Sequence, residues 1–78
     1  MRNATRVVVG TLTDEGVECQ ALRSDHGDLY TLIGELHSFR NGDRVVVEGS
    51  VADVSYCQQG TTMTVLTIRF DGSGSSAP

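Results

Sequence analysis

The chain has 78 residues, and its ten acidic and six basic residues give it a net charge of -4 at pH 7. This length predicts one domain with a small core, since so short a chain buries only about 60% of the surface that its unfolded form exposes. The acidic balance disfavours binding to nucleic-acid phosphates, which needs a positive surface.

Three strands are expected in the first half of the chain. Residues 6–12 carry three consecutive valines, whose β-branched side chains pack well on a pleated surface. Residues 17–23 and 29–34 follow as two further strands, joined by a tight turn. Gly27 in that turn is expected in the left-handed conformation of a bulged hairpin.

Residues 35–40 show no strand alternation and predict one short helical turn. Leu36 and Phe39 are three positions apart, a spacing that directs both side chains toward the core from a single helical turn. A helix this short needs tertiary packing to be stable. The Asn41-Gly42 pair after it is typical of the left-handed residue that ends a helix.

Residues 42–51 carry the strongest strand pattern, because apolar and polar side chains alternate after a second valine triplet. Gly49 lies on the apolar side of this alternation, which predicts a bulge or bend of the kind that a small curved barrel needs. The strand is expected to continue to about residue 54. An edge strand of a β-sandwich is the alternative interpretation.

Residues 61–70 form the expected fifth strand, and a domain of residues 1–71 is followed by a flexible, Gly/Ser-rich tail at residues 72–78. Where apolar residues are consecutive, the sequence does not decide which of them face inward. The expected core consists of residues 7–12, 45–51 and 65–68, with Val17, Leu22, Leu29, Leu32, Ile33, Leu36 and Phe39.

Three strands, a helical turn and two strands follow the order of the OB fold, a five-stranded Greek-key barrel. Over residues 5–70 the chain resembles a family of small, uncharacterised bacterial OB-like domains. The resemblance implies an all-β, OB-like Greek-key barrel and assigns no chemistry. It rests on Gly10-Thr11-Leu12, Gly16-Val17-Glu18-Cys19, Leu22-Arg23, residues 27–32, Gly42-Asp43-Arg44-Val45 and Cys57-Gln58-Gln59-Gly60.

Cys19 and Cys57 are the first candidate site, and their spacing matches no zinc motif. In an OB barrel the two residues would lie in loops that border the same ligand face, which favours a disulfide. Such a bridge would contribute about 4 kcal/mol on the chain-entropy model, provided that the compartment is oxidising. The alternative is two buried thiols that act as small hydrophobes.

A face for single-stranded nucleic acid is the second candidate, because OB folds stack bases on aromatic side chains in a basic groove. Phe39 and Phe70 are expected in the core, so Tyr30 and Arg23 would have to form the stacking platform. Alternatively, Tyr30 packs its ring on the barrel with its hydroxyl in water. Few aromatic residues and a negative charge make nucleic acid the less favoured ligand.

A non-enzymatic binding module for a protein or peptide is the favoured function, since a barrel leaves strand edges and a concave face accessible. Gln58 and Gln59 in the last loop add polar contacts to the expected ligand face of Arg23 and Tyr30. The valine triplets would also allow a second copy to cover one outer face, so a homo-oligomer is a further expectation.

Catalytic, metal and cofactor sites are not predicted. His26 and His37 lie far apart in the sequence, and neither an activated nucleophile nor a phosphate-binding loop is recognisable. Asp25 and Asp28 are turn residues in which Asp suits the backbone geometry.

The compartment depends on processing. No apolar run approaches the roughly 18 residues of a membrane span, and residues 1–5 lack the layout of a signal peptide. The sequence as written is therefore expected in the cytoplasm. Removal of a leader, together with a Cys19–Cys57 bridge, would instead indicate the periplasm or the extracellular space.

Overall fold

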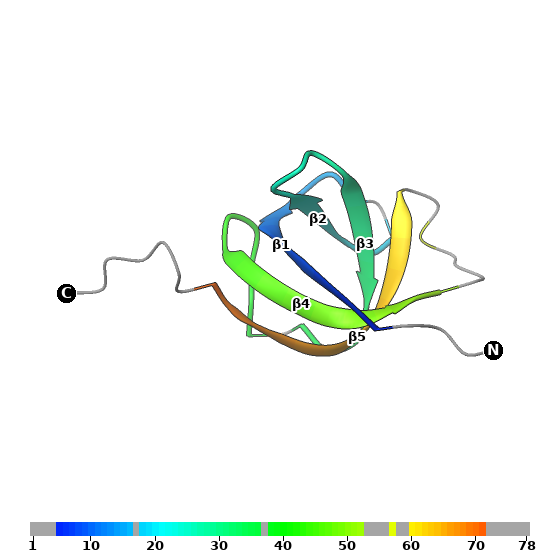
Figure 1. The fold of residues 1–78 in the computed structure, drawn as a ribbon. Helices are drawn as coiled ribbons and strands as arrows, with labels where there is room; N and C mark the ends of the chain where they lie inside the picture. Colours follow the sequence, from blue (N-terminus) through cyan, green and yellow to red (C-terminus); the bar gives the residue numbers. More distant parts are fainter. Residues whose placement is uncertain (1–4, 17, 37, 53–56, 58–59, 72–78) are drawn as a thin grey trace.

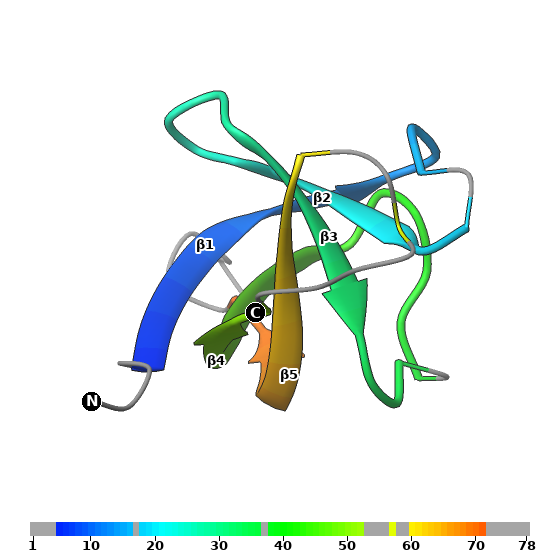
Figure 2. The same cartoon turned by 90° about the vertical axis from the view of Figure 1, so that its right-hand side faces the viewer.

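A computed structural model describes residues 5–16, 18–36, 38–52, 57 and 60–71. Its five strands close into a barrel in the order β1-β2-β3-β5-β4 (Figures 1 and 2). The expected all-β, five-stranded barrel is thereby confirmed, although β2 begins later than expected and Ala52 already lies outside β4. The strands are β1 (Thr5–Thr13), β2 (Gln20–Ser24), β3 (Leu29–Ile33), β4 (Arg44–Val51) and β5 (Thr61–Phe70).

Neighbouring strands are antiparallel except β3 and β5, which run parallel. β1 is shared between two neighbours: it pairs with β2 from Gly10 to Thr13 and with β4 from Thr5 to Thr11. Among the strands that the structure describes, the first half of β1 therefore borders β4 alone.

The predicted bulge at Gly49 is confirmed. The pairing of β4 with β5 shifts register between Glu48 and Gly49, so that Leu66 is an extra residue in β5. A Cβ atom at Gly49 would clash with the main-chain oxygen of Thr64. The close approach of β4 to β5 at this position therefore requires a residue without a side chain. Gly27 also has the expected positive φ, at 92°.

The expected helical turn is not confirmed, since the described residues between β3 and β4 form no helix. One hydrogen bond of 3.0 Å, from the Phe39 N–H to the Leu36 carbonyl, makes a single turn there. Both side chains nevertheless pack against the core, and the Phe39 ring lies 4.7 Å from the ring of Phe70. Their packing thus needs a turn of the right spacing and not a helix.

The core cluster is made by alternate residues of the strands, which decides the inward-facing positions that the sequence left open, although all three valines of β4 are buried. Val7 is 62% exposed and Leu66 is 64% exposed, because each points out of the barrel. The expected core position of Phe70 is wrong, since this residue is 60% exposed at the end of β5. Met63 is fully buried, although it was not among the expected core residues. The buried cluster consists of Val8, Leu12, Leu22, Leu32, Val45, Val47 and Met63.

Candidate functional site

The two cysteines lie at disulfide distance, with sulfur atoms 2.01 Å and Cα atoms 5.4 Å apart. This confirms the expected pairing. Cys19 directly precedes β2, and Cys57, which is fully buried, lies in the connection between β4 and β5. The bridge therefore ties the β4–β5 connection to the start of β2.

A row of buried residues on the outside of the barrel accompanies this bridge. Ala21, Thr31 and Thr62 pair across β2, β3 and β5, and their sequence neighbours Leu22 and Met63 point into the core. The row therefore faces outward, yet all three residues are at most 6% exposed. The Thr31 and Thr62 hydroxyl groups are hydrogen-bonded at 2.8 Å. We call this row the covered face.

Arg23 and Tyr30 do not form a joint platform. Arg23 pairs with Leu29 across β2 and β3, so their side chains share one face, and Tyr30 points to the opposite face. Tyr30 packs against the barrel core, which agrees with the alternative considered for it. Gln58 and Gln59 lie outside the described residues.

Arg23 is also engaged locally. Its guanidinium pairs with the Glu15 carboxylate and donates a 2.8 Å hydrogen bond to the Gly27 carbonyl. The hydrogen bond from Arg23 is the main cause, with a second from Thr13, of a lowered pKa at Glu15. Arg23 thus braces the β1–β2 turn against the β2–β3 hairpin.

The candidate site is a half-open pocket of about 460 Å³ at the other side of the barrel. It lies between the first half of β1 and the hairpin that joins β2 to β3. One wall is apolar and the other carries carboxylates. The lining residues are Val7, Val8, Val9, Ser24, Asp25, His26, Asp28, Tyr30, Arg44 and Asp71.

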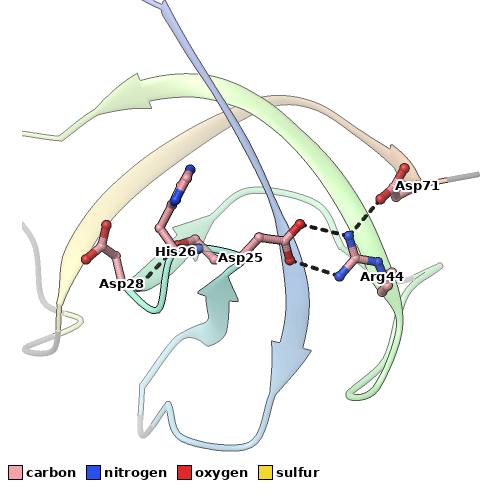
Figure 3. Close-up of polar contacts among 6 residues, drawn as sticks. Asp25, His26, Asp28, Arg44 and Asp71 are labelled. Atoms are coloured by element: carbon pink, nitrogen blue, oxygen red, sulfur yellow. Dashed lines mark hydrogen bonds and ion pairs between the residues drawn. The ribbon is translucent and has the colours of Figure 1, made fainter. Parts of the chain in front are cut away.

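Ser24 builds the hairpin wall of this pocket. Its main chain closes the turn, because its N–H donates to the Asp28 carbonyl at 2.8 Å and its carbonyl accepts from Gly27 at 2.9 Å. Its hydroxyl accepts hydrogen bonds of 3.1 Å from the N–H groups of His26 and Asp28. The turn is therefore held from within, and the side chains of His26 and Asp28 project from it in the same direction (Figure 3).

Arg44 joins three parts of the chain at the rim of the pocket (Figure 3). Its two terminal nitrogens each lie 2.9 Å from an oxygen of Asp25, and one of them is also 2.9 Å from Asp71. The hydrogen bonds from Arg44 hold the pKa of Asp25 below its ordinary value, and the two carboxylates raise the pKa of Arg44. The start of β4, the β2–β3 hairpin and the end of β5 are thereby fastened together.

The remaining charge of the pocket is acidic. Among the described lining residues, Asp25, Asp28 and Asp71 contribute three carboxylates, whereas Arg44 is the one guanidinium. Asp28 is exposed, and its carboxylate is within electrostatic range of Arg23, whereas Asp25 and Asp71 are hydrogen-bonded to Arg44. The pocket therefore suits a ligand that is cationic at one end and apolar along its stem.

Comparison with known proteins identifies a family. A family model described as a protein of unknown function, DUF5818, matches residues 9–69. The chain belongs to the DUF5818 family. Neither a curated protein nor a solved structure gives a significant match. The matched part of this DUF5818 domain includes both cysteines and the hairpin that carries Asp25 and Asp28.

The DUF5818 chain shows no metal site among its described residues, where no three His, Cys, Asp or Glu side chains are placed to hold an ion. Within the same residues, none of the structure is a helix with the length and apolarity to cross a membrane.

Sequence reasoning missed the pocket, although it noted Asp25, His26 and Asp28 as turn residues. Arg44 and Asp71 were given no role, since they lie 27 positions apart and meet only when β4 and β5 pair. The available signal was their position: Arg44 begins β4 and Asp71 directly follows β5, and antiparallel neighbours bring such ends together.

Proposed function

We propose that this DUF5818 domain is a non-enzymatic binding module with an OB-like barrel, and that its ligand is a basic segment of a protein or peptide. The strand order β1-β2-β3-β5-β4, with β3 parallel to β5, supports the OB-like Greek-key assignment. The DUF5818 family has no assigned activity, so the function is argued from the pocket alone.

The observation that carries the proposal is the pairing of a carboxylate wall with a valine wall in one pocket. A Lys or Arg side chain fits this pairing, since it lays its aliphatic stem on apolar surface and holds its charge against a carboxylate. Asp28 is the proposed contact for that charge, because Asp25 and Asp71 are already occupied by Arg44.

The same wall argues against nucleic acid. Carboxylates repel phosphates, and the platform of Arg23 and Tyr30 on which base stacking would depend is not formed. A basic peptide should bind more weakly as salt rises, because the attraction between exposed charges is screened.

A selection from a randomised library of short peptides at low ionic strength tests the proposal. We expect peptides rich in Arg or Lys to be enriched, and Asp28→Asn to weaken their binding several-fold. Asp14→Asn is the matched control, since Asp14 is an exposed carboxylate in the β1–β2 turn outside the pocket. Failure to enrich any peptide, an unchanged affinity of Asp28→Asn, or tight binding of a labelled single-stranded oligonucleotide would contradict the proposal.

A further inference from the structure

The first half of β1 has one strand neighbour instead of two. Pairing with β2 ends at Gly10, opposite Ser24, whereas pairing with β4 continues to Thr5. Figure 2 shows this half of β1 and the β2–β3 hairpin diverging from the point where they pair. Among the described residues, the edge of β1 at residues 5–8 that faces away from β4 therefore has no strand beside it. We call it the open edge.

Hydrogen bonds further along β1 define which residues present their main chain to this edge. Leu12 donates its N–H to Asp43 and accepts one from Gly42, so Leu12 faces β4, whereas the Val9 carbonyl accepts the N–H of Asp25 on the other side. Sides alternate along a strand, and the two polar groups of one residue point the same way. The N–H and carbonyl of Val7 therefore point out of the open edge.

This edge lacks most of the devices that block pairing with another strand. Such devices include Lys, Pro, bulges and a covering loop. Residues 5–9 contain neither Lys nor Pro, and Arg6 is their one charge. The edge is accessible, since Val7 is 62% exposed, and it forms the apolar wall of the pocket.

We propose that the partner binds as an extended strand along the open edge, with its main chain paired to the N–H and carbonyl of Val7. This inference rests on the proposed function and adds the mode of binding. Strand addition supplies affinity through main-chain hydrogen bonds, and alternate side chains supply specificity. One set of those side chains meets the acidic hairpin wall, which selects a basic residue.

A single peptide segment fits this edge better than a second barrel. The pocket has about 460 Å³ and is bounded on its far side by Asp25, His26 and Asp28 of the hairpin. A strand needs a lane of about 4.8 Å beside its neighbour. The acidic wall complements a basic segment, whereas a second copy of this domain carries a net charge of -4.

The test uses a capped peptide in which Arg and Val alternate, titrated into the isotope-labelled full chain. Two further peptides carry the same side chains, with N-methyl groups on the Arg residues in one and on the Val residues in the other. Only one set of amides faces a neighbouring strand. We expect one N-methylated peptide to lose roughly tenfold or more in affinity, and the other to bind like the parent.

Variants of Val7 test the protein side of the same bonds. Val7→Pro removes an N–H that faces away from β4, so it should abolish peptide binding and leave the barrel folded. Val7→Thr keeps the N–H and should therefore retain peptide binding that Val7→Pro loses. If Val7→Pro fails to fold, the affinities of the two N-methylated peptides still test strand addition, because they are measured on the unaltered protein.

Equal binding of the two N-methylated peptides, or no binding of the parent peptide, would overturn strand addition. The proposed function would still stand if library peptides bound and responded to Asp28→Asn. Absence of any peptide binding in both experiments would overturn the two together.

Discussion

The covered face and the open edge both contain side chains that alternation directs out of the barrel, but the first set is buried and the second is exposed. On the covered face, Ala21, Thr31 and Thr62 point out of the barrel and are nonetheless buried. On β1, Val7 points out of the barrel and is 62% exposed. The apolar valine is therefore exposed and the polar threonines are buried, which is the reverse of what residue type alone would indicate.

The difference lies in what covers each region. The three residues of the covered face are buried, whereas among the described residues no strand lies along the open edge. Two outward-facing regions of this small barrel thus differ in their exposure to solvent. This separation motivates the assignment of ligand binding to the open edge and its pocket.

The largest expected effect comes from removing the disulfide bridge. The double variant Cys19→Ala/Cys57→Ala should lose about 4 kcal/mol of unfolding free energy, because the bridge closes a loop with a sequence separation of 38. Denaturant unfolding measures this loss. Reductant should destabilise the wild-type protein to the same extent and have no effect on the double variant.

Hydrogen exchange then compares the two regions directly. Loss of the bridge should speed exchange of the Ala21 and Thr31 amides more than exchange at Val7, whose N–H already points out of the open edge. Equal stability with and without the bridge, or equal acceleration in both regions, would contradict the proposed role of the bridge.

A smaller loss is expected from the hydroxyl pair on the covered face. Thr31→Ala should cost about 1–2 kcal/mol, because the buried Thr62 hydroxyl loses its 2.8 Å partner. Thr64→Ala on exposed β5 surface is the control and should change stability by less than about 0.5 kcal/mol. In a double-mutant cycle, Thr31→Ala and Thr62→Ala together should cost less than the sum of the two.

The ion pair of Arg44 with Asp25 at the rim of the pocket should make the stability of the fold depend on pH. The pKa of Asp25 is lowered in the folded state, so its ionised form stabilises the fold above the ordinary carboxyl pKa and this contribution is lost as pH falls through the lowered value. Arg44→Met should therefore melt below the wild type at pH 7, and the gap should narrow below about pH 4.

The part of this effect that comes from Asp25 should be smaller than the effect of Thr31→Ala, because the side chains of Arg44 and Asp25 are about half exposed. Arg69→Met serves as the control, since Arg69 is exposed on β5 and makes no ion pair with the described residues. A gap for Arg44→Met that stays constant between neutral and acid pH would rule out the pairing as its cause.

The smallest effect belongs to the open edge. Val7→Thr should change the unfolding free energy by less than about 0.5 kcal/mol, since the side chain is exposed. Val8→Thr, one residue along, should cost about 1–3 kcal/mol because it places a hydroxyl in the core. Equal costs at the two positions in equilibrium unfolding would contradict the assigned faces of β1.

The sequence by itself determined the five strands, the bulge at Gly49, the left-handed Gly27 and the cysteine pair. These features depend on local properties: valine triplets and alternation favour extended chain, and glycine marks positions where a Cβ atom is not tolerated. The paired cysteines were predictable because only two are present and their expected loops border one face.

Only the tertiary structure decided which member of each apolar run faces inward, and which outward-facing side chains are buried. A run of three valines does not show which of them faces the core. The exposure of Val7 therefore follows from its register with β4. The pocket joins Arg44, Asp25 and Asp71, which are remote in the chain and meet because the strand ends converge. Pairing between distant strands therefore created the candidate site, and local pattern has no means to encode it.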